Sequence, residues 1–529
     1  MELSGMSSCI FCPLLLLIIQ LSFSFSLHEG NETDRLSLLA FKAQITDPLD
    51  ALSSWNVSTH FCKWSGVICG HRHQRIVELN LQSSQLRGSL SPHIGNLSFL
   101  RVLDLEGNYF SRDIPQELGR LFRLQSLVLA NNTFSGEIPV NISSCSNLLF
   151  LHLGSNNLTG KIPAQLGSLS KLGSFVLQFN NLVGDIPSSL GNLSSVQKFF
   201  WTKNYLRGGI PDSLGNLKRL KYFTADENDL SGTIPSSICN ISSLALVSLE
   251  QNQLHGRLPP DLGLYLPNLA YLVISWNHLN GPIPATLSNA SKFFFVDLSY
   301  NNLTGKIPDL ASLPDLQKLL VHDNDLGNGE EDDLSFLHTL ANSTNLVSLG
   351  MNDNNFGGVL PEIVSNFSTN LKRITFGRNQ IHGSIPAEIG NLISLVALGL
   401  ETNQLHGIIP SSIGKLQNLG VLRLDENKIS GSIPSSLGNV TSLLEVGFAQ
   451  NNLQGTIPAS LGNWHKLLIL DLSQNNLSGP IPKEVLGISS LSVLLDLHDN
   501  QLTGSLPSEV AWSVGESWIS EGFQKQVIG

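Results

Sequence analysis

The eight letters "NNLTGKIP" occupy residues 156–163 and return unchanged at residues 301–308. The two copies begin 145 residues apart, which is six steps of 24 residues plus one. A phrase that returns at such an interval indicates either one duplicated block or a regular array of structural units. The residues between and beyond the two copies decide between these possibilities.

The array is regular, because an asparagine that precedes the pattern x-L-x-G-x-I-P returns about every 24 residues. These asparagines are Asn108, Asn132, Asn156, Asn180, Asn204, Asn228, Asn252, Asn277, Asn301, Asn324, Asn354, Asn379, Asn403, Asn427, Asn451, Asn475 and Asn500. Ser84 holds the same place one step earlier, so the chain contains 18 repeats. "NNLTGKIP" is therefore one part of a repeat array.

Each repeat follows the pattern L-x-x-L-x-L-x-x-N-x-L-x-G-x-I-P. In "LQSLVLANNTFSGEIP" (residues 124–139) the leucines are predicted to point inward, and the residues between them, Ser126, Val128 and Ala130, outward. Alternation with a period of two predicts a short, half-buried strand. The asparagine side chain both donates and accepts, so it can satisfy backbone groups of its own coil and of a neighbouring coil.

A single repeat cannot bury its apolar face alone, so stacked repeats must share one continuous core. We therefore expect an α/β repeat solenoid with a parallel sheet along its concave side. Short 3-10 or irregular segments should line its convex side. At about 4.8 Å between strands, 18 repeats would line roughly 80 Å of surface.

The pattern resembles the plant-type leucine-rich repeat over about residues 76–510. Residues 27–75 resemble the helical amino-terminal cap of plant leucine-rich repeat receptors, in "TDRLSLLAFKAQI", "DPLDALSSWN" and "CKWSGVIC". The short spacing of Cys62 and Cys69 suits a small disulfide loop in an oxidising compartment. The resemblance implies that this bridge pins the cap over the apolar end of the first repeat.

One irregularity in the repeat length points to a particular subfamily of these receptors. The step from Asn324 to Asn354 is 30 residues long, so the repeat at residues 324–353 is extended. This is similar to the subfamily of plant immune receptor kinases that contains the rice bacterial-blight resistance receptor and the elongation-factor-Tu receptor. The resemblance implies that the concave face binds a microbial peptide or protein. It also implies a partner, a co-receptor kinase of the same repeat class, which the carboxy-terminal repeats recruit.

Composition and the two ends of the chain bear on its location. The net charge of −11, with only 31 Lys and Arg, argues against a nucleic-acid partner. Residues 1–26 read as a signal peptide, with a buried helix or a retained anchor as the alternative. No later segment reaches 18 uninterrupted apolar residues, so we expect no membrane span after it and a location outside the cell. Cys145 and Cys239 are expected to be small buried hydrophobes.

The chain shows no motif for catalysis, a cofactor or a metal. "HRHQR" at residues 71–75 has no ligand partners at metal-binding spacing and is predicted to be a solvated loop. The acidic run from Glu330 to Asp333 lacks the spacing of a calcium-binding loop and is also predicted to be solvated. Kinase motifs are missing from this chain, although full-length relatives carry a Ser/Thr kinase after a single membrane span.

Glycosylation acceptors are frequent. The N-x-[ST] sequons are Asn31, Asn56, Asn96, Asn131, Asn141, Asn157, Asn192, Asn240, Asn289, Asn302, Asn342, Asn366, Asn439 and Asn476. Most are predicted to lie on turns and on the convex side, and Asn131 beside the strand face. Glycans would then leave the concave face mainly open.

The outward strand positions are the candidate binding residues, because they can vary without changing the core. They are Phe179, Lys198, Phe200, Lys203, Tyr222, Tyr271, Trp276, Phe294, Phe295, Tyr300, Arg373, Arg378 and Arg423. Neighbouring exposed aromatics indicate a contact surface. The alternative is that these rings simply pack on one another across adjacent strands. Phe199 and Trp201 fall in the inward register and are predicted to be core.

Residues 511–529 lack the leucine spacing of the repeats. A truncated receptor or a natural soluble form would explain this loss of the pattern. The sequence thus favours the ligand-recognition ectodomain of a plant immune receptor kinase. The alternative is a secreted soluble binder, such as a decoy or an inhibitor of a microbial wall-degrading enzyme.

Overall fold

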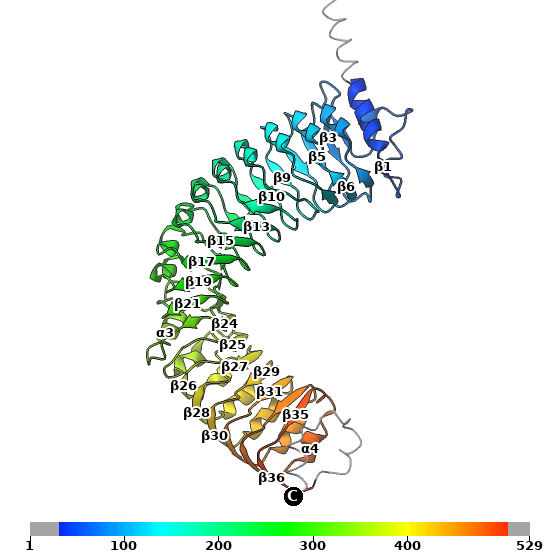
Figure 1. Ribbon diagram of the computed structural model, residues 1–529. Coiled ribbons are helices and arrows are strands. Elements are labelled where there is room, and N and C mark those ends of the chain that lie inside the picture. Colours follow the sequence, from blue (N-terminus) through cyan, green and yellow to red (C-terminus); the bar gives the residue numbers. More distant parts are fainter. Residues whose placement is uncertain (1–30, 506–529) are drawn as a thin grey trace, which may run out of the picture. The chain divides into compact units, whose positions relative to one another are not determined.

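The computed structural model describes residues 31–505, which form two compact units, residues 31–231 and residues 232–505 (Figure 1). Each unit is described by itself. The proposed signal peptide at residues 1–26 and the tail at residues 511–529 lie outside the described residues.

Each repeat forms one coil, and most coils contain the same parts. In the coil of Asn132, β7 (Ser126–Val128) belongs to the main sheet, β8 (Thr133–Ser135) to a second sheet, and η4 (Val140–Ser144) is a 3-10 turn. Successive coils pair in parallel and in register, as in Leu127 opposite Leu151. Within each unit the main sheet runs along one side of the stacked coils and the 3-10 turns along another (Figure 1).

The first unit begins with a helix at residues 31–42. Its main-sheet strands are β2 (Val67–Cys69), β3 (Ile76–Asn80), β5 (Val102–Asp104), β7, β9 (Phe150–His152), β10 (Ser174–Val176), β12 (Lys198–Phe200) and β14 (Tyr222–Thr224). Its other strands are β1 (Ile45–Thr46), β4 (Arg87–Ser89), β6 (Tyr109–Asp113), β8, β11 (Val183–Asp185), β13 (Tyr205–Gly208) and β15 (Asp229–Gly232). Its 3-10 turns are η1 (Phe61–Lys63), η2 (Pro92–Asn96), η3 (Gln116–Arg120), η4, η5 (Ala164–Ser168), η6 (Ser188–Asn192) and η7 (Asp212–Asn216).

In the second unit the main-sheet strands are β16 (Leu246–Ser248), β18 (Tyr271–Val273), β20 (Phe295–Asp297), β22 (Lys318–Leu320), β24 (Ser348–Gly350), β25 (Arg373–Thr375), β27 (Ala397–Gly399), β29 (Val421–Arg423), β31 (Glu445–Gly447), β33 (Ile469–Asp471) and β35 (Leu494–Asp496). The other strands are β17 (Gln253–Arg257), β19 (His278–Gly281), β21 (Asn302–Gly305), β23 (Asp325–Leu326), β26 (His382–Ser384), β28 (Gln404–Ile408), β30 (Lys428–Gly431), β32 (Asn452–Gly455), β34 (Asn476–Pro480) and β36 (Gln501–Thr503). The turns and helices are η8 (Ser236–Asn240), α2 (Leu262–Tyr265), η9 (Ala285–Asn289), α3 (Phe336–Leu340), η10 (Glu362–Asn366), η11 (Ile389–Asn391), η12 (Ser411–Lys415), η13 (Ser435–Asn439), η14 (Ala459–Asn463) and α4 (Lys483–Leu486).

The predicted fold class is confirmed, and the inward leucines form the core as the repeat pattern predicts, whereas the prediction of Ala130 as an outward residue is wrong because it is 1% exposed. Leu124, Leu127 and Leu129 are fully buried, and so are Phe199 and Trp201. Only β1 with β4 and β2 with β3 pair antiparallel among the strand pairs of the described residues. Both exceptions belong to the start of the chain, where the cap meets the first repeats.

The asparagine of each repeat links two coils, as predicted. The Asn427 side chain donates from Nδ2 to the carbonyl of Leu400 in the preceding coil at 2.9 Å and to that of Leu424 in its own coil at 3.2 Å. Its Oδ1 accepts from the backbone N–H of Leu405 at 2.9 Å. One buried side chain thus satisfies backbone groups that neither strand pairing nor water reaches.

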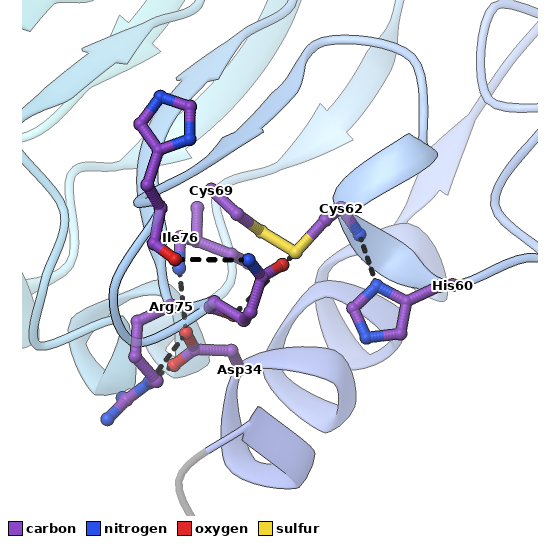
Figure 2. The surroundings of a disulfide bond; sticks show 8 residues. Asp34, His60, Cys62, Cys69, Arg75 and Ile76 are labelled. Carbon is purple, nitrogen blue, oxygen red and sulfur yellow. Dashed lines mark hydrogen bonds and ion pairs between the residues drawn. A yellow bond between two sulfur atoms is a disulfide. The ribbon is translucent and has the colours of Figure 1, made fainter. Parts of the chain in front are cut away.

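The amino-terminal cap is held by a disulfide and by a buried ion pair (Figure 2). The predicted disulfide between Cys62 and Cys69 is present. Asp34, on the helix at residues 31–42, is fully buried. It accepts from the Arg75 guanidinium at 2.8 and 2.7 Å and from the backbone N–H of Ile76 at 3.0 Å. The pair joins the cap helix to the start of β3.

The loop at residues 71–75 is therefore only partly solvated. Residues 71–74 are exposed, but the interpretation of the whole run as a solvated loop is wrong for Arg75, whose side chain is 14% exposed. Sequence spacing did not reveal its partner, because Asp34 lies 41 residues earlier in the chain.

The two remaining cysteines of the described residues are buried thiols, as expected. Burial raises the pKa of the Cys145 thiol, and likewise that of Cys239, to about 11. Neither thiol is a reactive nucleophile at neutral pH, because only the thiolate reacts readily. Among the helices at residues 31–505, none is long and apolar enough to cross a membrane.

Candidate functional site

The solvent side of the main sheet, here called the strand face, carries most of the candidate residues. In the first unit, β12 and β14 place Lys198 opposite Tyr222. The Lys198 Nζ lies 5.9 Å from the centre of the Tyr222 ring, and the Phe200 and Tyr222 rings are 6.4 Å apart. Lys198 is exposed, whereas both rings are half-buried. These rings pack across adjacent strands and still present one side to solvent.

Six of the candidates do not lie on strands: Phe294 directly precedes β20, and the other five stand at a turn. Phe179, Lys203, Trp276, Tyr300 and Arg378 each stand immediately before the asparagine of their repeat, with φ between 52° and 60°. Their prediction as strand positions is wrong, because the chain turns at this point through the left-handed region. This position is here called the turn position, and it forms one rim of the strand face.

The left-handed conformation at the turn position is imposed by the geometry of the repeat, whichever residue occupies the position. Positive φ recurs at the turn position with residues as different as Ser155, Glu227, Thr402 and Gln474. A left-handed conformation costs an L-residue roughly 1–2 kcal/mol, and only Gly, Asn and Asp adopt it readily. Large aromatic side chains at this position are therefore not explained by backbone preference.

In the second unit the aromatic candidates separate into two groups at opposite ends of the same strands. The first group, the strand-start cluster, consists of Tyr271, Phe294 and Phe295. Tyr271 is opposite Phe295 across β18 and β20, and its ring lies 5.4 Å from that of Phe294. The Lys318 Nζ stands 5.2 Å from the centre of the Phe295 ring. All three rings are partly exposed.

The second group, the turn cluster, consists of Trp276, Tyr300 and His322. The Trp276 and Tyr300 rings stack at 3.8 Å with an angle of 16°, and His322 meets the Tyr300 ring edge-on at 5.2 Å. His322 Nδ1 is 2.8 Å from Asp323 Oδ2. Partial burial, followed by Asp323, raises the pKa of Tyr300. Trp276 remains 52% exposed, so the stack leaves much of its ring in solvent.

The candidate arginines are all exposed, and two of them have acidic partners. Arg423 Nε donates to Glu445 Oε1 at 2.6 Å on the adjacent strand, and Arg378 pairs with Asp353 at 3.3 Å. Arg373 lies on β25, two strands before Arg423 on β29. The hydrogen bond with Glu445, with the charges of Glu401 and Asp425, raises the pKa of Arg423, so the Arg423 guanidinium stays positively charged.

Sequence reasoning missed an acidic part of the strand face between β24 and β33, where glycines leave the backbone without side chains. Outward positions there are occupied by Gly350, Gly377, Gly399 and Gly447. A Cβ at Gly377 would lie 2.5 Å from the Glu401 carboxyl carbon, so that carboxylate lies over the bare backbone. Asp425 occupies the corresponding space beside Gly447.

The Asp425 carboxyl is unusual on this surface. Burial, and then the neighbouring charges of Asp471 and Glu401, raises its pKa to about 6, although the backbone N–H of Ala449 donates to it at 3.0 Å. The signal for this region was available in the sequence as a group of glycines at outward positions, three of them on strands, in neighbouring repeats.

The sequons leave most of the strand face open. Their asparagine side chains are exposed, apart from the half-exposed Asn31 and Asn96. Asn131 stands at a turn position, whereas several others end 3-10 turns. Among the described residues of the second unit, no sequon falls on a main-sheet strand or at a turn position. The use of these sites stays a prediction.

Family comparisons agree with this architecture. The family described as "Leucine rich repeat N-terminal domain" matches residues 31–70, and "Leucine-rich repeat region" matches residues 68–280. "Leucine Rich Repeat" matches residues 418–440 and 466–487. The cap and the coils up to residue 280 fall within the first two matches, and two later segments fall within the third.

Two curated relatives are receptor kinases. The chain is 46% identical over 104 residues to the LRR receptor-like serine/threonine-protein kinase EFR of Arabidopsis thaliana, covering 19% of this chain and 10% of the relative. It is 48% identical over 87 residues to the receptor kinase-like protein Xa21 of Oryza sativa subsp. japonica, covering 15% and 8%. The matched segments thus span a tenth or less of these relatives.

Solved ectodomains match over most of their length. The Arabidopsis receptor kinase HAESA, in complex with the peptide hormone IDA and the co-receptor SERK1, is 30% identical with a TM-score of 0.64. That match covers 90% of this chain and 95% of the HAESA chain in that structure. PEPR1 in the PEPR1–AtPEP1 structure is also 30% identical, with a TM-score of 0.63 and coverage of 91% and 80%. The chain belongs to the leucine-rich repeat ectodomains of plant receptor-like kinases.

Proposed function

We propose that this chain is the extracellular ligand-recognition domain of a receptor kinase, and that it binds a peptide or protein along the strand face. The observation that carries the proposal is Trp276, a large ring that is 52% exposed at a backbone position that disfavours it. Asn or Gly at this position would suit the left-handed turn better. A contact with a ligand would explain why an exposed tryptophan occupies this position.

The spacing of the two clusters indicates the size of the ligand. Tyr271 begins β18 and Trp276 lies in the turn after that strand, so the two clusters are at opposite ends of the same coil segment. This segment spans at most roughly 16 Å, the length it would have if it were fully extended. A peptide segment is long enough to contact both clusters at once. The ring surfaces, with Lys318 at one end and Asp323 at the other, suit a chain with both apolar and charged side chains.

The finer assignment rests on resemblance. The extended repeat and the likeness to EFR and Xa21 support a role in immunity, with a microbial peptide or protein as ligand. The HAESA structure contains a co-receptor, and by analogy a co-receptor kinase of the same repeat class is the proposed second partner. These partners are proposals for the whole receptor to which the ectodomain belongs.

The test uses the purified full chain, and its probe is the peptide fraction below 10 kDa from bacterial culture filtrate. Peptides retained on the chain are identified by mass spectrometry, synthesised and titrated calorimetrically. Trp276→Asn should weaken binding at least tenfold, because an anchoring ring is lost. The melting temperature should change little, since the better backbone fit of Asn offsets the lost stack with Tyr300.

Tyr265→Asn is the matched control, because Tyr265 is 54% exposed in α2, away from the strand face. Binding that survives Trp276→Asn and Phe294→Ala, or that Tyr265→Asn weakens as strongly, would contradict the proposed site. Inhibition of a microbial wall-degrading enzyme by the purified chain, measured in a separate activity assay, would favour the inhibitor alternative.

A further inference from the structure

The extended repeat at residues 324–353 contains a carboxylate whose setting neither the fold nor the proposed ligand site explains. Asp333 is 1% exposed, so its interpretation as part of a solvated acidic loop is wrong. Its Oδ2 accepts three backbone N–H groups, from Asn328 at 2.9 Å, Glu330 at 3.0 Å and Gly357 at 3.0 Å. These bonds hold the loop after β23 against the next coil.

The other oxygen of this carboxylate is buried without a partner. Asp333 Oδ1 accepts no hydrogen bond from any residue that the structure describes. A buried, ionised oxygen is costly unless a donor or a cation satisfies it.

Two further carboxylates converge on Asp333. Glu330, Asp332 and Asp333 each offer an oxygen, and these oxygens lie within 4.8 Å of one another. Oxygens on opposite sides of a calcium ion are up to about 5.2 Å apart. The three oxygens are therefore close enough to one another to contact one calcium ion once the Lys306 ammonium has left the cluster.

One lysine currently neutralises part of the cluster. Lys306 Nζ lies 2.8 Å from Glu330 Oε2 and 2.5 Å from Asp332 Oδ1, and these carboxylates raise its pKa. The side chains of Lys306, Glu330 and Asp332 are 36%, 58% and 67% exposed, so the ammonium can swing into solvent. The remaining acid of the run, Glu331, points to His382 Nε2 at 3.1 Å.

We propose that Glu330, Asp332 and Asp333 bind one calcium ion, which displaces the Lys306 ammonium and gives Asp333 Oδ1 its missing partner. Water completes the coordination sphere. With three carboxylates and no preformed cage, the affinity belongs to the range of extracellular calcium modules, about 10⁻⁴–10⁻³ M. The bound ion would fix the loop at residues 327–335 against Gly357, independently of any ligand on the strand face.

The test is equilibrium dialysis of the full chain with radioactive calcium at constant ionic strength. Wild type should bind one site-specific ion in the range above, and magnesium in equal concentration should compete weakly. Asp332→Asn and Glu330→Gln should each weaken this site at least tenfold. Both residues are exposed, so loss of folding does not complicate the result.

Two variants separate a calcium site from a plain ion pair. Lys306→Met removes the competing ammonium and should tighten calcium binding several-fold. Asp315→Asn, an exposed acid of the same unit outside the cluster, should leave binding unchanged. Calcium binding that is absent in wild type, or unaffected by Asp332→Asn, or equally weak in Lys306→Met, would overturn the proposal and leave Lys306 as the partner of the loop.

Discussion

At the scale of single residues, the repeat asparagine has the clearest energetic role. Its amide group makes hydrogen bonds to two coils at once, and the same arrangement returns from Asn108 to Asn500. The residue before it adopts the left-handed conformation in the same turn. One residue type thus closes the core and sets the geometry of the rim.

Asn427→Ala should lower the free energy of unfolding by about 2–3 kcal/mol, because the Leu405 N–H and the carbonyls of Leu400 and Leu424 lose their buried partner. Chemical denaturation followed by circular dichroism measures the change. The neighbouring Lys428→Ala, at an exposed position, should change it by less than about 0.5 kcal/mol. If the two variants lowered the free energy of unfolding equally, the asparagine amide would have no special role in stability.

Asp425 predicts a pH effect on stability. In the unfolded chain this carboxyl titrates near 3.9, whereas in the folded chain its pKa is about 6. Between these values the unfolded chain loses its proton first, so the free energy of unfolding falls as the pH rises from about 4 to about 6. It stays lower above that window.

Asp425→Asn keeps an acceptor for the Ala449 N–H but removes the titration. The variant should therefore be more stable than wild type above pH 6, by roughly 1–2 kcal/mol, and similar to it near pH 4. Unfolding curves at pH 4, 5, 6 and 7 measure the difference. Asp229→Asn, at an exposed carboxylate of β15, should show the same pH dependence of the free energy of unfolding as wild type. If Asp425→Asn also shows the wild-type pH dependence, the assignment is refuted.

At the scale of elements, the cap helix depends on a contact that no local pattern reveals. Asp34 is the buried partner of Arg75, and the disulfide between Cys62 and Cys69 lies beside this pair (Figure 2). The disulfide closes the segment between the cap helix and β3, but the ion pair is what ties the helix itself to β3.

Asp34→Ala should destabilise the cap by about 3 kcal/mol, because it leaves Arg75 and the Ile76 N–H without their buried acceptor. Hydrogen exchange by mass spectrometry should show lost protection at residues 31–42 and 75–80, with the later coils unchanged. Glu32→Ala, which removes an exposed pair with Arg35, should leave exchange at residues 75–80 as in wild type. Unchanged protection in Asp34→Ala would mean that the disulfide alone holds the cap.

At the scale of the whole molecule, the repeat period was sufficient to predict a solenoid with a parallel sheet. A chain whose apolar residues return every 24 positions can bury them only by stacking equivalent coils. The same period predicted that Phe199 and Trp201 are core and that Lys198 and Tyr222 are outward. These predictions depend on alternation within one strand, which is a local property.

The candidate site was predicted less completely, and the residues that differ show why. Trp276 and Tyr300 were expected on strands with Tyr271 and Phe294, but the left-handed turn moves them to the opposite rim. Alternation alone does not indicate where a strand ends. The acidic part around Asp425 was missed because it depends on glycines in neighbouring coils.

The amino-acid pattern alone thus established the coil, its inward leucines, the asparagine ladder and the disulfide, since each follows from spacing within one or two repeats. Contacts across coils needed the folded chain: Asp34 with Arg75, Trp276 on Tyr300, and Asp333 held by Gly357. The physical reason is that periodicity specifies which side of a coil a residue occupies. The distance between two side chains in different coils depends on how those coils are stacked and where the backbone turns.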